Sequence, residues 1–95
     1  MSVHHPAVDQ VVASFRDEIT ALDVRLVSTI NARIKVVKAL AQYKQERGLA
    51  FVDPEREALL VAYLKRVNSG PISDEGLEEL LTYVLALVKK EVARG

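Results

Sequence analysis

The sequence contains no cysteine and no tryptophan, and its few aromatic residues are three tyrosines and two phenylalanines. The lack of cysteine excludes disulfide bonds, thiol nucleophiles and metal sites with cysteine ligands. No apolar run approaches the length that a membrane-spanning helix needs. The N-terminal segment MSVHHPAVDQ has neither a basic n-region nor an apolar h-region. We therefore expect no signal peptide and a cytoplasmic protein.

Net charge is also absent, because 13 basic side chains balance 13 acidic ones. This balance argues against nonspecific nucleic-acid binding, although it leaves a local cationic pocket open. A glycine-rich phosphate loop is missing, so nucleotide binding has little support. The serines have no plausible histidine partner, since His4 and His5 are adjacent in an expected N-terminal tail. We expect neither a serine nucleophile nor a metal site.

Glycine and proline instead divide the chain into helices. Asp53-Pro54 is typical of an N-cap followed by the first helical residue, and Ser73 is typical of another N-cap. The apolar spacing predicts three helices, at about 8–46, 54–68 and 74–93, and no strands. The chain is thus expected to form one all-α domain over residues 1–95, with 1–7 as a flexible tail.

The first helix is too long for a small monomer. About 39 helical residues extend roughly 58 Å, whereas a compact chain of this size is roughly 30 Å across. Its apolar residues nevertheless continue along its whole length. A second copy of the chain is the simplest partner that could bury the apolar residues beyond the compact part. We expect a helical homodimer packed along this helix. The alternative is a kink near Ser28-Thr29 and a monomeric four-helix bundle.

Charged residues interrupt the apolar face of this helix. The face begins with Phe15, Ile19, Leu22, Leu26 and Ile30, and the same spacing then reaches Arg33, Val37, Leu40 and Lys44. In the second helix, the face that holds Leu60 extends back to Arg56 and Glu57. Moving a cation from water to the interior of a protein costs free energy unless an opposite charge or a hydrogen-bond acceptor compensates for the lost hydration. This pattern predicts a cation-lined pocket for a small ligand with more than one carboxylate or phosphate.

Each charge also has a simpler interpretation. Arg33 can pair with a core carboxylate or extend to the surface, and Lys44 can favour the helix dipole. Arg16 lies beside the apolar face, near acidic surface neighbours. Asp53 can act only as an N-cap, and Arg56 with Glu57 can be an ordinary first-turn pair. The combination of Arg33, Lys44 and Arg56 in one interior is harder to explain in these terms.

These residues resemble a known family. The segment from Arg16 to Leu26, RDEITALDVRL, is followed by Arg33, by Lys44 and by the segment DPERE at 53–57. This series is similar to the all-helical, type II (AroQ-class) chorismate mutases over almost the whole chain. The opening helical pattern has modest specificity, whereas the complete series at these spacings is quite specific.

The resemblance implies an intertwined all-α homodimer with two active sites. The implied reaction is the Claisen rearrangement of chorismate to prephenate, on the route to phenylalanine and tyrosine, and it needs no cofactor. Arg33 and Arg16 of the partner subunit would clamp the two substrate carboxylates. Lys44 would contact the ether oxygen and a carboxylate. Glu57 would accept a hydrogen bond from the ring hydroxyl, with Asp53 nearby, and Arg56 would support the pocket.

The third helix departs from the family pattern. The family often has a serine there, followed four residues later by a glutamine or glutamate that touches the ether oxygen. An ungapped match from Ser73 places Val88 and Val92 at these positions, whereas a shift of one residue places Leu87 and Glu91 there. We favour Glu91, because it continues the apolar face of this helix.

Other functions stay open. An isochorismate pyruvate lyase and a 4-amino-4-deoxychorismate mutase would bind almost the same dianion with the same cations. A different class of function is a non-catalytic or regulatory helical dimer. A further alternative is a weak mutase that a partner enzyme of the shikimate pathway activates, for which the basic C-terminal end at Lys89, Lys90 and Arg94 offers a docking segment.

The assignment of Glu91 generates a prediction about pH. A glutamate donates a hydrogen bond to an ether oxygen only when it is protonated. We therefore expect mutase activity to rise as the pH falls below 7 and to be lost as Glu91 ionises. Initial rates measured from pH 5 to 8 test this expectation, and a flat profile would count against the role of Glu91.

Overall fold

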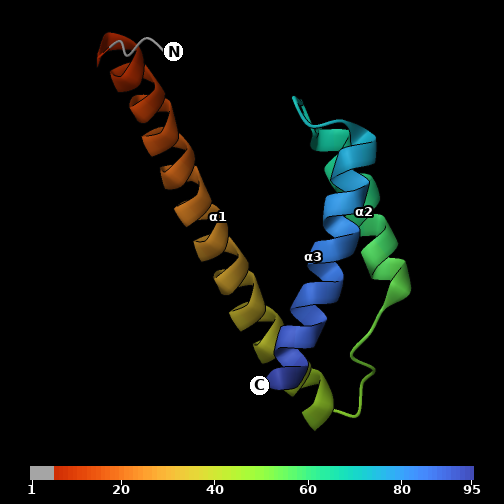
Figure 1. Cartoon of the computed structure of the whole chain (residues 1–95). Helices are drawn as coiled ribbons and strands as arrows, with labels where there is room; N and C mark the ends of the chain where they lie inside the picture. Colours follow the sequence, from red (N-terminus) through yellow and green to blue (C-terminus); the bar gives the residue numbers. More distant parts are fainter. Residues whose placement is uncertain (1–5) are drawn as a thin grey trace. The chain divides into compact units, whose positions relative to one another are not determined.

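The structure, a computed structural model, describes residues 6–95. It contains helices α1 (Pro6–Glu46), α2 (Pro54–Val67) and α3 (Asp74–Arg94), and no strand in this range (Figure 1). The all-α fold with three helices and a very long first helix is therefore confirmed. α1 begins two residues before the expected start, because proline suits a first helical position that needs no N–H partner. Since α1 is one helical element, the alternative with four helices is wrong.

The chain divides into two compact units, with the boundary between Ala32 and Arg33. In the described part of the first unit, the N-terminal portion of α1 leaves most of its large apolar side chains exposed. Phe15 is 60% exposed, Ile19 56% and Leu22 59%. Within residues 6–95, none of the helices combines the length and the apolar character needed to cross a membrane.

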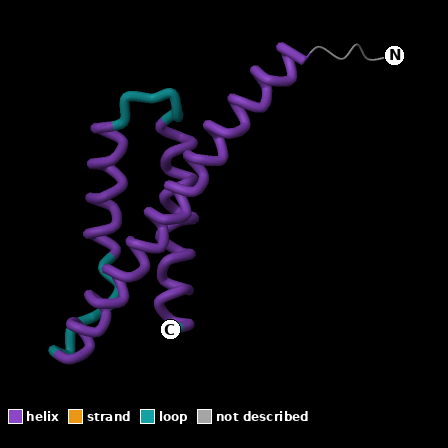
Figure 2. Tube along the Cα trace, turned by 90° about the vertical axis from the view of Figure 1, so that its left-hand side faces the viewer, coloured by secondary structure: helices purple, strands orange, loops and turns teal. Residues whose placement is uncertain are grey.

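The second unit, Arg33–Gly95, contains the C-terminal portion of α1 together with α2 and α3. α2 and α3 lie side by side and are joined by a short connection (Figures 1 and 2). Lys65 Nζ of α2 lies 2.6 Å from Glu78 Oε2 of α3, and this hydrogen bond raises the pKa of the Lys65 ammonium. Val88 is 1% exposed and is the one fully buried large side chain among the described residues. The core of a single chain is therefore small.

Local hydrogen bonds fix the helix ends of this unit. Asp53 Oδ1 accepts a hydrogen bond from the Arg56 amide at 3.1 Å, and Ser73 Oγ accepts one from the Gly76 amide at 3.0 Å. Both residues are therefore N-caps, as the sequence predicted. After α1, Gly48 adopts a φ of 67°, a left-handed conformation that glycine accepts without strain. These caps determine where the side chains of the last turn of α1 and the first turn of α2 lie.

The cap of α3 generates a stability prediction. Replacing Ser73 with alanine removes the acceptor for the Gly76 amide, so we expect the free energy of unfolding to fall by about 1 kcal/mol. Urea denaturation followed by circular dichroism measures this change. Ser69→Ala, in the same connection, is the control and should change stability by less than about 0.5 kcal/mol. Equal effects of the two substitutions would contradict the capping role.

Candidate active site

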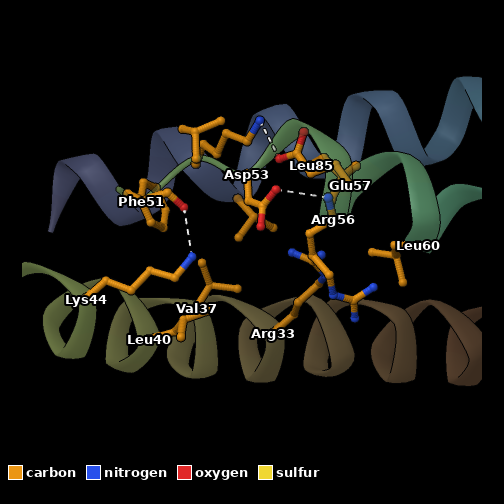
Figure 3. A pocket seen from close by; sticks show the side chains of 13 residues that line it. Arg33, Val37, Leu40, Lys44, Phe51, Asp53, Arg56, Glu57, Leu60 and Leu85 are labelled. Atoms are coloured by element: carbon orange, nitrogen blue, oxygen red, sulfur yellow. Dashed lines mark hydrogen bonds and ion pairs between the residues drawn. The ribbon is translucent and has the colours of Figure 1, made fainter. Parts of the chain in front are cut away.

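The second unit contains a cavity of about 210 Å³, partly open to solvent, between the C-terminal part of α1, the segment 51–53, α2 and α3 (Figure 3). Apolar side chains form much of its wall: Val37, Leu40, Phe51, Val52, Leu60, Leu85 and Val88. Charged side chains complete it: Arg33, Lys44, Asp53, Arg56, Glu57 and Lys89. Apolar walls with a few convergent charges are typical of a small-molecule site.

α1 supplies two cations to this cavity. Arg33 and Lys44 stand on one face of the helix, with Val37 and Leu40 between them, and both are half-buried. Figure 3 shows Arg33 extending from α1 toward Arg56 of α2, and Lys44 extending from α1 toward Phe51. Lys44 Nζ donates a hydrogen bond of 3.4 Å to the carbonyl oxygen of Phe51. This bond ties the segment after α1 to the helix face that carries the cations.

The N-cap and the first turn of α2 supply two carboxylates and a guanidinium. Asp53, Arg56 and Glu57 are spaced three and four residues apart, so they lie on one side of the helix start. All three line the cavity. Both carboxylates also lie close to the N-terminus of α2, where Asp53 is the N-cap and Glu57 belongs to the first turn. The N-cap role of Asp53 therefore coexists with its place at the cavity.

α3 contributes Leu85, Val88 and Lys89. Lys89 Nζ forms an ion pair of 2.6 Å with Glu57 Oε1, and their side chains are 36% and 30% exposed. Sequence reasoning missed Lys89 as a site residue. The available signal was its place four residues after Leu85, which continues the inward face of α3.

Two of the predicted site residues lie elsewhere. Glu91 is not among the side chains that line the cavity, and its Oε1 pairs with Arg94 Nη1 at 2.9 Å within α3. Arg16 belongs to the first unit and is also not part of the lining. Val88, which the ungapped match from Ser73 places at the serine position of the family and which could thereby contact the substrate, does lie in the wall. The roles of all predicted site residues toward a substrate stay predictions. His4 and His5 lie outside the described residues.

The charges of the lining determine which ligands suit the cavity. Four basic and two acidic side chains leave a formal charge of +2, which complements a small dianion. The described residues that line it include no serine, threonine, tyrosine, cysteine or histidine. The arrangement is thus suited to holding an anionic molecule and stabilising charge on it, rather than to attack by a hydroxyl, thiol or imidazole.

The sequence pattern of the family described as chorismate mutase type II matches residues 15–92. The chain belongs to this family. Every residue of the cavity wall lies within the matched segment. Chorismate mutases are isomerases, so the chain is a member of an enzyme family.

Solved structures agree with this assignment. The chain is similar to the chorismate mutase (form II) of Thermus thermophilus, with a TM-score of 0.83 and 25% identity over 87% of this chain and 94% of the other. Form I of the same mutase gives a TM-score of 0.79 and 26% identity over 81% and 96%. A comparison with the curated proteins gave no match.

Proposed function

We propose that this member of the chorismate mutase family converts chorismate to prephenate in the biosynthesis of phenylalanine and tyrosine. The observation that carries the proposal is the cavity, where α1 supplies Arg33 and Lys44 and α2 supplies Arg56 and Glu57. The whole wall, to which α3 also contributes, has a formal charge of +2. Chorismate is a dicarboxylate, so its charge complements this wall. The cytoplasmic location expected from the sequence belongs to the proposal as well.

Each charged group has a proposed role. Arg33 binds one substrate carboxylate in a bidentate manner, and Arg16 of the partner subunit binds the other. Lys44 stabilises the negative charge that develops on the ether oxygen as its C–O bond breaks. Glu57 accepts a hydrogen bond from the ring hydroxyl, and Arg56 and Asp53 support these groups. The positions of Arg33, Lys44 and Glu57 around one cavity support this division of roles.

The reaction itself does not require the protein to supply a nucleophile or to transfer a proton. In a Claisen rearrangement, a C–C bond forms while the ether C–O bond breaks, and six electrons move in one cycle without a proton transfer. The substrate must adopt a compact conformation in which the two reacting carbons approach each other. A cavity that fixes both carboxylates favours this conformation, and the cation at the ether oxygen lowers the barrier further.

The proposal includes a homodimer packed along α1. Phe15, Ile19, Leu22 and Leu26 share one face of the helix and are each more than half exposed in the single chain. Exposed apolar side chains in a continuous row are typical of an interface. The same helical spacing continues along α1 to Arg33, a residue of the cavity wall. This continuity supports the proposal that a second chain, packed along α1, supplies Arg16.

The first test is the loss of chorismate absorbance with the purified protein and with Arg33→Ala. Removal of a bidentate, charge-assisted interaction costs on the order of 3 kcal/mol, so we expect kcat/KM to fall about 100-fold. Arg66→Ala, the same chemical change on an exposed part of α2 outside the cavity, should leave kcat/KM unchanged. Chromatography identifies prephenate as the product.

The outcomes separate the proposal from its alternatives. Turnover that persists in Arg33→Ala would contradict the assigned site. If the wild-type protein leaves chorismate unchanged, isochorismate and 4-amino-4-deoxychorismate are the next substrates to test. Glu91→Gln, measured beside the wild type from pH 5 to 8, shows whether the carboxyl group that pairs with Arg94 takes part.

The dimer has its own test. Leu22→Lys places a charge in the exposed apolar row, so we expect sedimentation equilibrium to show dissociation to monomers at micromolar concentration. Mutase activity should fall in parallel, because each site loses the partner's Arg16. Val24→Lys is the matched control, since Val24 is also exposed but lies on the opposite side of the helix. A wild-type monomer, or an unaffected Leu22→Lys dimer, would contradict the proposed interface.

A further inference from the structure

We propose that Lys89 is a positioning and charge-balancing residue of the active site, which holds Glu57 by an ion pair and offsets its charge toward a dianionic substrate. This inference rests on the proposed function, because it concerns the same cavity. It assigns a role to a residue that neither the family resemblance nor the sequence pattern singled out for the site.

The geometry of the pair is the first argument. Lys89 Nζ lies 2.6 Å from Glu57 Oε1, and both side chains line the cavity. The two residues come from different helices, α3 and α2, so the contact is not a consequence of helical spacing. Both are about one-third exposed, which weakens screening by solvent relative to a surface pair.

The second argument is that Glu57 pairs with Lys89 and not with the other cations of the cavity wall. Among the described residues of the wall, Lys89 and Glu57 form the one ion pair between side chains. Arg33, Lys44 and Arg56 are not engaged by a carboxylate side chain there, although Asp53 and Glu57 share the cavity with them. The pair therefore satisfies Glu57 without using a cation that would bind the substrate.

The charge of the wall is the third argument. With Lys89 the wall carries a formal charge of +2, and without it the charge would fall to +1. The unpaired carboxylate of Glu57 would then face a ligand with two negative charges. Like charges at such short range weaken binding. Lys89 thus allows the carboxylate of Glu57 to lie in a site that binds an anion. Lys89 holds Oε1 of Glu57, and Oε2 can accept a hydrogen bond from the substrate hydroxyl.

Lys90 provides a matched comparison. It carries the same charge on the next residue of α3, but it is exposed and does not line the cavity. An effect of general charge on the substrate would be similar for the two lysines. An effect of the ion pair belongs to Lys89 alone.

The kinetic test uses Lys89→Met, Lys89→Arg and Lys90→Met with chorismate. We expect Lys89→Met to raise KM about 10-fold, with a smaller effect on kcat, because the unpaired Glu57 repels the bound dianion. Lys89→Arg keeps the charge and should return KM to within about 3-fold of the wild-type value. Lys90→Met should leave both constants unchanged. Equal effects at positions 89 and 90 would overturn the inference.

A double-mutant cycle distinguishes positioning from direct contact with the substrate. If Lys89 acts through Glu57, the KM of the double variant with Glu57→Gln and Lys89→Met should lie close to that of Glu57→Gln alone. If the second substitution adds its full 10-fold increase, Lys89 acts on the substrate independently of Glu57. That additive result would overturn the inference.

A substrate-free measurement separates the inference from the proposed function. Nitrogen-15 NMR detects the Lys89 ammonium group, whose protons should exchange more slowly with water in the wild type than in Glu57→Gln. Slow exchange without turnover of chorismate would confirm the pair and contradict the proposed function. Turnover with rapid exchange at Lys89 in both proteins would support the proposed function and overturn the inference.

Discussion

The placement of two cations on an apolar helix face constrains the rest of the site. Arg33 and Lys44 occupy positions of α1 where the heptad-like spacing otherwise places valine and leucine. A fully packed core cannot form around them, because their charges would lose hydration without compensation. The result is a cavity with an apolar wall, in which both groups remain half-buried. The carboxylates at the start of α2 and the lysine of α3 lie in the wall of the same cavity, where they complete the set of charges that Arg33 and Lys44 begin.

The same arrangement suits a reaction that needs orientation and charge stabilisation. A single chain buries little apolar surface, so its fold gains rigidity from helix caps, from Lys65 with Glu78 and from Lys89 with Glu57. Such ion pairs contribute little stability when exposed, but they fix the position of a side chain. At Glu57, the group being fixed belongs to the cavity. Stability and site geometry thus depend partly on the same contacts.

Much of the fold could be predicted from sequence, because Asp53-Pro54, Gly48 and Ser73 mark helix ends with specific local chemistry. The helical period also placed Arg33 and Lys44 on one face. The alignment of the third helix with the family pattern was harder to predict. Apolar residues surround its polar ones on several sides, so the sequence does not decide between two registers that differ by one residue. In the sequence, Lys89 belongs to a basic C-terminal end with Lys90 and Arg94 that suggests a docking segment, which concealed its place at the cavity. Its partner Glu57 is distant in sequence, so only the tertiary structure shows the pair.

The two connections between helices differ in how much change they can accept. The connection 68–73 is held by its own hydrogen bonds, with Asn68 contacting both the Ile72 carbonyl and the Gly70 amide, and none of it lines the cavity. The connection 47–53 ends in three residues of the cavity wall and is bonded to Lys44 through Phe51. Length variation during evolution, or an inserted peptide in an engineered variant, is therefore compatible with the former, whereas the latter has a length fixed by the site.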